Sequence, residues 1–363
     1  MRKVLKTGRI IFFGLTICLI ALFIIFYIYS PGKPQSFLDE NGNPIENSIS
    51  IIEKISIGDV SQHLIIRGVD TRNPVLLFIH GGPGFPEFTI FKESNTNLEK
   101  EFVVVYWEQR GAGKSMSNNI PDSSMNLEQF IQDTSDVSEY IKKRFNRQKI
   151  HLMGHSWGSL VGILTAHRYP QHFNSYVGIG QIVKQYEGEQ ISLDWIKNEA
   201  RKRKDNRALK KIVKIDIPDS LADGKIWLDY LMRQRAYVQK YGGGMDREKT
   251  NIWTYTVKLI TKTKEYTLKE KLNFIKGNPY SVKRLWPDVV QTNLFNEIDS
   301  IAIPIYFMHG VHDYQVPYSL AKKFYTKVNA PKKTFISFNN SAHAPFLDET
   351  EKFNATIIEK ILR

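Results

Sequence analysis

The stretch Ile150–Arg168 (IHLMGHSWGSLVGILTAHR) decides which fold this sequence predicts. Residues 150–154 have the composition of a buried strand, whereas residues 158–168 have the spacing and composition of a helix. Between them lies a G-x-S-x-G pentapeptide, residues 154–158. Glycines flank Ser156 because a tight strand-to-helix turn leaves no room for side chains beside it, and such a turn lifts the serine hydroxyl above the sheet edge. The sequence therefore predicts a nucleophilic serine at the end of a strand.

Further strands and helices alternate on both sides of this turn. The short apolar runs that predict strands are Ile51–Ile57, His63–Arg67, Val75–His80, Phe102–Trp107, Tyr176–Ile179, Ile303–His309 and Thr334–Phe338. The other segments with helical spacing are Leu127–Phe145, Leu320–Val328 and Thr350–Leu362. Runs that are apolar throughout indicate strands buried on both faces. We expect an α/β fold, with a mostly parallel sheet and helices on both of its faces.

The alternation stops between residues 185 and 298, where the pattern is mostly helical. This predicts a helical cap at 185–298, inserted into a core formed by residues 49–184 and 299–363. Residues 30–48 are rich in Pro, Gly, Asn and Ser, which is the composition of a linker.

The net charge of +13 comes from 50 Lys and Arg against 37 Asp and Glu, and it is unevenly distributed. Residues 1–9 contribute +4 and residues 185–298 contribute +8, whereas 10–184 and 299–363 together contribute only +1. A basic nucleic-acid-binding protein would carry its positive charge along the surface that binds the phosphates. We therefore expect no nucleic-acid partner.

The N-terminal segment predicts a membrane anchor. Residues 10–29 (IIFFGLTICLIALFIIFYIY) contain no charged side chain. A helix of that length spans about 30 Å, the thickness of the hydrocarbon core of a bilayer. Because the preceding residues 1–9 are basic, we expect a cytoplasmic N-terminus, a transmembrane helix in contact with membrane lipid, and an extracytoplasmic catalytic domain in a single-pass protein of the cell membrane.

Three alternatives remain open for this segment. A cleaved signal peptide would have a shorter apolar region that ends in a small-x-small site. A lipoprotein would be modified at Cys18, although Ile17 stands before it where a small residue is expected. The third alternative is a buried helix of a soluble domain. Since Cys18 is the single cysteine of the chain, the sequence excludes an internal disulfide framework and a Cys-rich zinc site.

A serine nucleophile needs a base to take its proton and an acid to orient that base. On this kind of strand–serine–helix turn, the acid and then the base follow the serine along the chain. Asp313 comes just after a late strand, and His343 lies between the last strand and the last helix. We predict that His343 is the base and Asp313 the acid. An ordinary turn residue is the alternative for Asp313, whose nearest rival is His312.

Two further loops frame the predicted site. HGGPG, residues 80–84, follows a predicted strand, and its backbone amides can face an anion. We expect the oxyanion to be bound by the amides of Gly82 and of Trp157, the residue after the nucleophile. The second loop, WEQRGAGKS at 107–115, ends like a phosphate-binding loop but has Glu108 where that motif requires glycine. We predict instead a structural loop in which Glu108 forms an ion pair with Arg110.

HGGPG at 80–84, EQRGAGKS at 108–115 and GHSWGS at 154–159 together resemble the proline iminopeptidase family, a group of serine aminopeptidases within the α/β hydrolases. The resemblance covers residues 75–184 and 299–363. It implies a helical cap between these two segments, no metal and no organic cofactor. By motif position it implies the nucleophile Ser156, the acid Asp313, the base His343 and the oxyanion-binding amides of Gly82 and Trp157.

The segment 185–298 departs from this family in its charge. Aminopeptidases of the family hold the free amino group of the substrate with acidic side chains of the cap, whereas the cap here has a net charge of +8. Three acids remain candidates for substrate binding: Glu187 and Glu189 at the start of the cap, and Glu87 after the HGGPG loop. A solvated surface carboxylate is the alternative for each of them.

These observations lead to one hypothesis and two alternatives. The hypothesis is a membrane-anchored serine hydrolase that releases the N-terminal residue of short peptides through an acyl-enzyme. The first alternative is a membrane-associated esterase that hydrolyses carboxylic esters, and the second is a non-catalytic binding protein on the same scaffold. The substrate is thus a small peptide or an ester, and the sequence leaves the preferred residue and the oligomeric state open.

Overall fold

The computed structural model describes residues 2–248 and 252–362. Eight strands form one sheet in the order β1-β2-β4-β3-β5-β6-β7-β8. The strands β1 and β2 and the β2–β4 pair are antiparallel, and all other neighbours are parallel. Their bounds are β1 Ile49–Ile57, β2 Val60–Gly68, β3 Val75–Ile79, β4 Val103–Glu108, β5 Ile150–His155, β6 Phe173–Ile179, β7 Ile305–Gly310 and β8 Lys333–Phe338. The mostly parallel α/β sheet predicted from the sequence is confirmed.

The central strands are buried on both faces, as their uninterrupted apolar runs predict. In β3, Val75, Leu77 and Ile79 belong to one hydrophobic cluster, whereas Leu76 and Phe78 belong to a second cluster on the opposite face. This alternation follows from the two-residue period of a strand, which points successive side chains to opposite sides of the sheet.

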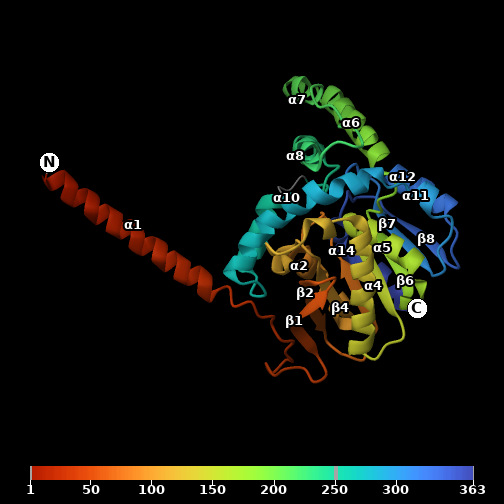
Figure 1. The fold of residues 1–363 in the computed structure, drawn as a ribbon, viewed down its shortest axis with the longest axis horizontal. Coiled ribbons are helices and arrows are strands. Elements are labelled where there is room, and N and C mark those ends of the chain that lie inside the picture. The colour runs from red at the N-terminus through yellow and green to blue at the C-terminus, as the bar shows by residue number, and fades with distance from the viewer. Residues whose placement is uncertain (1, 249–251, 363) are drawn as a thin grey trace.

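Helices cover both faces of the sheet (Figure 1). One cluster takes in side chains from α4 (Leu127–Arg144), α5 (Trp157–Arg168) and α12 (Tyr318–Lys327). The other takes in side chains from α2 (Phe88–Ser94), α3 (Leu98–Glu101), α13 (Pro345–Asp348) and α14 (Thr350–Leu362). Within α4, Phe130, Ile131, Val137 and Ile141 are buried at helical spacing, so a single face of the helix packs on the sheet.

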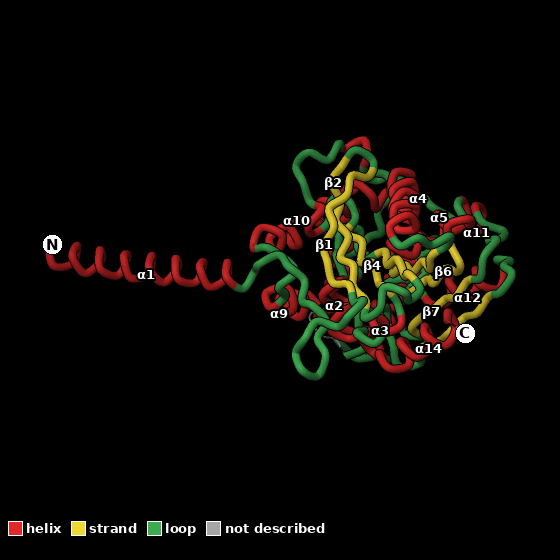
Figure 2. The backbone as a smooth tube through the Cα atoms, turned by 90° about the horizontal axis from the view of Figure 1, so that it is seen from below, coloured by secondary structure: helices red, strands yellow, loops and turns green. Residues whose placement is uncertain are grey.

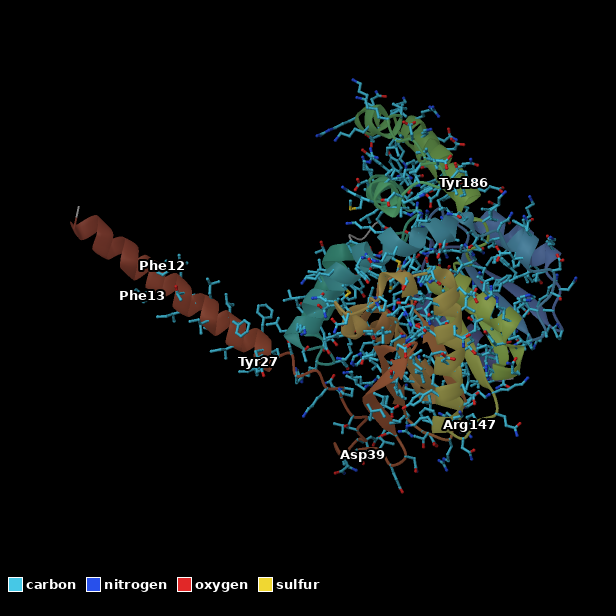
Figure 3. The ribbon with its side chains drawn as sticks, viewed as in Figure 1. Phe12, Phe13, Tyr27, Asp39, Arg147 and Tyr186 are labelled. Atoms are coloured by element: carbon cyan, nitrogen blue, oxygen red, sulfur yellow. The ribbon has the colours of Figure 1, made fainter. Side chains whose placement is uncertain are left out.

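Residues 185–298, called the helical segment below, lie between β6 and β7. They contain α6 (Gln185–Lys202), α7 (Asn206–Ile212), α8 (Gly224–Tyr241), α9 (Ile252–Lys262), α10 (Leu268–Gln291) and α11 (Leu294–Glu297). Figure 1 shows α6, α7 and α8 outside the layers that cover the sheet, with α10 between α8 and the strands. Figure 3 shows Tyr186 on α6, whose ring lies 6.2 Å from that of Trp227 on α8. The division into core and cap stays a prediction.

Helix α1 (Arg2–Ile28) extends away from the strands (Figure 2). The prediction of a transmembrane anchor at residues 10–29 is corrected, because none of the helices within the described residues is long and apolar enough to cross a bilayer. The predicted single-pass topology, the extracytoplasmic placement and the contact with membrane lipid are corrected on the same finding. The side chains of the N-terminal cations in residues 2–9 lie outside those described.

The predicted ion pair between Glu108 and Arg110 is wrong, because the two side chains bond to different parts of the molecule. Glu108 accepts a hydrogen bond from the Tyr266 hydroxyl of the helical segment and another, of 2.5 Å, from the Lys114 amide. Arg110 instead pairs with Asp133 of α4, at 2.7 Å from Nε to Oδ2 and 2.8 Å from Nη2 to Oδ1. The end of β4 and the loop after it are therefore bonded both to the helical segment, through Glu108, and to α4, through Arg110.

The Arg110–Asp133 pair lies at the centre of a buried polar network. Both side chains are fully buried. Gln62 of β2 donates to Asp133 at 2.7 Å and accepts from the indole of Trp107 at 2.9 Å. Gln129 also donates to Asp133, at 2.8 Å. Every oxygen of the buried carboxylate thus has donors, which offsets the cost of removing it from water.

Replacing Asp133 with Ala is expected to lower the free energy of unfolding by about 3–5 kcal/mol, because it leaves the buried Arg110 charge without its partner. The exposed pair Arg168–Glu128 offers a matched control, since Glu128→Ala removes an ion pair in water and costs about 1 kcal/mol or less. Urea unfolding followed by circular dichroism measures both changes. Equal losses in the two variants would contradict the structural role given to the buried pair.

Candidate active site

Ser156 occupies a strained turn between β5 and α5. Its backbone angles, φ of 54° and ψ of −119°, lie in a region that residues other than glycine rarely adopt. A Cβ added to Gly154 would lie 2.1 Å from the carbonyl oxygen of Gly158, and one added to Gly158 would lie 2.1 Å from that of Ile79. The two glycines of the pentapeptide are therefore required by backbone contacts that cannot be relieved by moving a side chain. The turn places Ser156 at the carboxyl edge of the parallel strands.

Asp313 and His343 come together although 30 residues separate them along the chain. The imidazole Nδ1 of His343 lies 2.7 Å from Oδ2 of Asp313, and both side chains are buried. Oδ1 of Asp313 accepts from the amides of Gln315 at 2.9 Å and Val316 at 2.8 Å. Burial alone would raise the pKa of Asp313, but His343 and His309 hold that pKa well below its ordinary value. Asp313 is therefore an ionised carboxylate that fixes the imidazole.

His343 lines the cavity that Ser156 also lines, and its second ring nitrogen takes no part in the contact with Asp313. Nε2 of His343 is buried and has no hydrogen-bond partner among the described residues. Burial lowers the pKa of His343, and the neighbouring Asp313 carboxylate counteracts only part of that effect. The imidazole is thus neutral near pH 7, with Nδ1–H donating to Asp313 and Nε2 able to accept a proton. His312, the rival of Asp313, takes no part in this hydrogen bond.

The two predicted oxyanion amides lie on segments that Gln109 connects. Gly82, with φ of 116°, lines the cavity in the loop after β3, and Trp157 is the first residue of α5. The first amides of a helix have no partner within it, so they can face an anion. Gln109 donates to the carbonyl of His80 at 2.9 Å and accepts from the indole of Trp157 at 2.9 Å. This bridge holds the two segments in register.

A cavity of about 670 Å³ lies over Ser156. Its size is in the range of small-molecule sites. Gly82, His155, Ser156 and His343 line it from the sheet edge, and residues of α8 and α10 line it from the helical segment. The apolar side chains among the lining residues are Phe85, Leu228, Leu231, Met232, Ala236, Met245, Val282, Trp286 and Val316.

Of the three acids predicted to bind substrate, Glu87 is the one that lines the cavity. Its Oε1 lies 2.7 Å from Nδ1 of His155, and its Oε2 accepts from the Gly81 amide at 2.9 Å. Burial would raise the pKa of Glu87, but the charge of His155 outweighs it and the pKa lies below its ordinary value. Burial would likewise lower the pKa of His155, and Glu87 holds it above its ordinary value. Glu87 and His155 therefore form a buried hydrogen-bonded pair beside Ser156, and both residues line the cavity.

Glu189 and Glu187 are placed differently. Glu189 is completely buried and is paired with Arg235 of α8, at 2.5 Å from Nη2 to Oε1 and 2.8 Å from Nη1 to Oε2. It is absent from the described lining of the cavity, whereas Arg235 is part of it. Glu187 pairs with Lys184 at 2.9 Å, with both side chains more than a third exposed. Glu187 is therefore a surface carboxylate outside the site.

Sequence analysis missed Arg235 and His155. Arg235 belongs to a stripe of α8 residues at three- and four-residue spacing that faces the cavity, from Leu228 to Lys240. That periodicity is visible in the sequence, but what it faces is not. His155 stands inside the G-x-S-x-G motif, whose middle positions carry no fixed identity. Among the described residues, the structure contains no cluster of three or more His, Cys, Asp or Glu that could hold a metal ion.

The chain is similar to known proteins over most of its length. A family model for the α/β hydrolase fold matches residues 74–215. The chain is 33% identical over 314 residues to a probable aminopeptidase, YbaC, of Bacillus subtilis (strain 168), with 86% of this chain and 97% of that protein covered. It is 21% identical over 296 residues to a proline iminopeptidase of Heyndrickxia coagulans, with 78% and 88% covered.

The fold also matches solved structures. A crystal structure of a proline iminopeptidase from Mycobacterium smegmatis superposes with a TM-score of 0.61 at 15% identity, over 86% of this chain and 97% of that one. This likeness shows the fold, whereas the similarity to the Bacillus subtilis protein extends over nearly its whole length at 33% identity. The chain is a hydrolase and belongs to the proline iminopeptidase-like family of α/β hydrolases.

Proposed function

We propose that the protein is a serine aminopeptidase that releases the N-terminal residue of short peptides. One observation carries the proposal: the Asp313-bound imidazole of His343 and the turn at Ser156 line the same cavity, and Nε2 of His343 has no partner among the described residues. A nucleophile, a base and an acid in this order are what acyl transfer requires. The names of the relatives, a probable aminopeptidase and a proline iminopeptidase, support an N-terminal residue as the group released.

Each of these residues has a step in the proposed reaction. Nε2 of His343 takes the proton of the Ser156 hydroxyl as its oxygen attacks the scissile carbonyl. Asp313 keeps the proton of the imidazole on Nδ1 and stabilises the imidazolium that forms. The amides of Gly82 and Trp157 donate to the oxyanion of the tetrahedral intermediate. His343 then gives its proton to the leaving amine, which departs and leaves an ester between Ser156 and the acyl group.

Water completes the cycle by the same residues in reverse roles. His343 takes a proton from a water molecule, whose oxygen attacks the ester carbonyl, and the oxyanion again lies against the two amides. His343 returns the proton to Ser156 as the carbon–oxygen bond breaks, and the free amino acid leaves. The enzyme is restored without any change in net protonation.

We assign the free amino group of the substrate to Glu87. Its carboxylate lines the cavity, and Glu87 Oε1 and Ser156 Cβ lie 3.1 Å and 3.2 Å from the same point, the position that a Cβ on Gly81 would take. In an N-terminal residue the ammonium group and the scissile carbonyl are attached to the same α-carbon. A substrate whose ammonium group binds Glu87 would therefore have its scissile carbonyl near Ser156. A carboxylate offers about four lone-pair sites, so the bonds from Gly81 and His155 leave acceptor capacity for it.

A fluorophosphonate probe is expected to label Ser156 covalently in the native protein, because the probe reacts only with an activated serine. Ser156→Ala should abolish labelling, whereas Ser117→Ala, which removes an exposed serine, should not change it. Peptide mass spectrometry of the labelled protein locates the adduct. Labelling at another residue, or none at all in the native wild type, would overturn the serine hydrolase mechanism.

Substrate panels separate the peptidase from the esterase. Turnover of aminoacyl arylamides is the result that the aminopeptidase proposal requires. Short-chain aryl esters without an amino group would be hydrolysed more slowly, because they leave Glu87 without an ammonium partner. Rapid ester turnover with no arylamide turnover would reject the aminopeptidase and favour the esterase.

Activity is expected to fall on the acid side with a midpoint below pH 6.5. Only neutral His343 can accept the serine proton, and burial holds its pKa below the ordinary value of 6.5. Below its pKa the imidazole is protonated, so kcat/KM should rise as pH increases through that value and then level off. The profile of kcat/KM between pH 4 and pH 8, with circular dichroism at each pH, measures this. A midpoint above pH 7 would contradict the assignment.

Glu87→Gln is expected to raise KM for aminoacyl arylamides and to lower kcat/KM by about 10- to 100-fold, which is the effect of losing one hydrogen bond between charged groups. Turnover of an ester without an amino group should change far less. Glu187→Gln is the matched control, because it makes the same change in a surface carboxylate outside the cavity. Equal losses for both substrate types in Glu87→Gln would show that Glu87 acts only by shaping the site.

A further inference from the structure

Helix α8 forms the wall of the cavity that faces the sheet edge. Its cavity-lining residues recur at three- and four-residue spacing between Leu228 and Lys240, so they lie on one face of the helix. Two of them, Arg235 and Lys240, are basic, and the others are uncharged. The positive charge that α8 presents to the cavity therefore comes from Arg235 and Lys240. The other residues of α8 that line the cavity have apolar or amide side chains.

Both basic residues have their acidic partners behind them. Arg235 pairs with Glu189, and Lys240 pairs with Asp205, which also caps the N-terminus of α7. Neither acid belongs to the described lining of the cavity, whereas both cations do. Each pair is thus oriented with its positive member toward the substrate space. A substrate that enters meets cations on this wall and an acid, Glu87, beside Ser156.

One edge of the Arg235 guanidinium has N–H groups that Glu189 and Gln234 do not use, so it can bind a further ligand. Glu189 occupies the edge formed by Nη1 and Nη2, and the second hydrogen of Nη1 goes to Oε1 of Gln234. No hydrogen bond from Nε of Arg235 is present among the described residues. The edge formed by Nε and Nη2 therefore remains, and two parallel N–H groups of this kind match the two oxygens of a carboxylate.

Arg235 is held in place in the wall of the cavity that Ser156 and His343 also line. Its side chain is 18% exposed, and its guanidinium carbon lies 6.0 Å from the ring centre of Trp286, another residue of the cavity wall. Gln185 donates to Oε1 of Glu189 at 2.7 Å and to the carbonyl of Gln315 at 3.1 Å. Since Gln315 follows Asp313 by two residues, this chain of contacts connects the ion pair to the loop that positions His343. A fixed, largely desolvated guanidinium needs little reorganisation to bind an anion.

We propose that Arg235 binds the C-terminal carboxylate of the substrate, so that the preferred substrates are dipeptides and tripeptides with a free C-terminus. This inference rests on the proposed aminopeptidase function and extends it to the recognition of the C-terminal end of the substrate. Glu87 takes the ammonium group beside Ser156, and Arg235 takes the carboxylate of the leaving group on the opposite wall. A cavity of about 670 Å³ that is lined by both Glu87 and Arg235 suits a short zwitterion, whereas a long peptide would place its carboxylate away from Arg235.

Binding to a Ser156→Ala protein tests the proposal without turnover. Isothermal calorimetry measures the Kd of one dipeptide as the free acid and as the C-terminal amide, in full-length protein. The acid is expected to bind about 10- to 100-fold more tightly than the amide, the range for a hydrogen-bonded charge pair. The same ratio is expected when Arg233→Gln is added, because Arg233 is an exposed residue of α8 outside the described cavity lining.

The decisive variant is Glu189→Gln with Arg235→Gln, again in the Ser156→Ala protein. Changing both members removes the cation without leaving a buried carboxylate unpaired, so the fold is preserved. The acid and the amide should then bind within a few-fold of each other. Arg235→Lys, which keeps the charge opposite Glu189 but loses the planar fork, should retain part of the preference. Circular dichroism and urea unfolding check the fold of each protein.

Three results would overturn the carboxylate site: equal binding of acid and amide to the Ser156→Ala protein, no binding of either at millimolar concentration, or an unchanged preference in the double variant. Hydrolysis of the same dipeptide by wild-type protein is measured separately. Preference for the acid without any turnover would reject the proposed aminopeptidase function and would still support the carboxylate site at Arg235.

Discussion

The close approach of three backbone segments at Ser156 is the constraint on which the site depends. The carbonyl of Ile79 at the end of β3 lies where a side chain on Gly158 would be, and the carbonyl of Gly158 lies where one on Gly154 would be. These contacts fix the end of β5, the start of α5 and the HGGPG loop relative to one another. Because the parallel strands beneath are buried on both faces, this arrangement rests on a rigid base. A strained φ at Ser156 is maintained by that base.

Several carboxylates near Ser156 and in the core are buried away from water, and each of them is stabilised by hydrogen-bond donors. Asp313 is stabilised by two amides and two imidazoles, Asp133 by Arg110 and two glutamines, and Glu87 by His155 and an amide. Each buried charge therefore has a partner and further hydrogen bonds, as burial in a low dielectric requires. The pairs differ in whether their members line the cavity: Glu87 and His155 both line it, and Arg235 lines it while Glu189 is absent from its described lining. Asp133 and Arg110 are absent from the described lining of the cavity over Ser156, which fits a structural role for their pair, whereas Glu87 and Arg235 line that cavity.

The sequence predicts the parts of the structure that local rules determine. Strand and helix positions follow from periodicity, and their ends differ from the structure by at most three residues. Ser156, Asp313 and His343 were predicted from a motif and from chain order, and the structure brings Asp313 and His343 into contact. The pairing of Glu108 with Arg110 was wrong because neighbours in sequence need not be partners in space: Glu108 bonds to Tyr266 and Arg110 to Asp133. Partners of this kind depend on helix packing, which periodicity does not define.

The charge of the helical segment illustrates the same limit. If its net charge of +8 were spread evenly over its surface, the helical segment would repel the ammonium group of a substrate. In the structure, the acid that faces the cavity, Glu87, belongs to the loop after β3, outside that segment, and the predicted cap acid Glu189 is neutralised by Arg235. The segment can therefore be basic while the space beside Ser156 retains a carboxylate. Binding at short range depends on the charges that line the cavity. The net charge of the helical segment therefore does not exclude a substrate with an amine, since Glu87 lines the cavity beside Ser156 and Arg235 and Lys240 line it from α8.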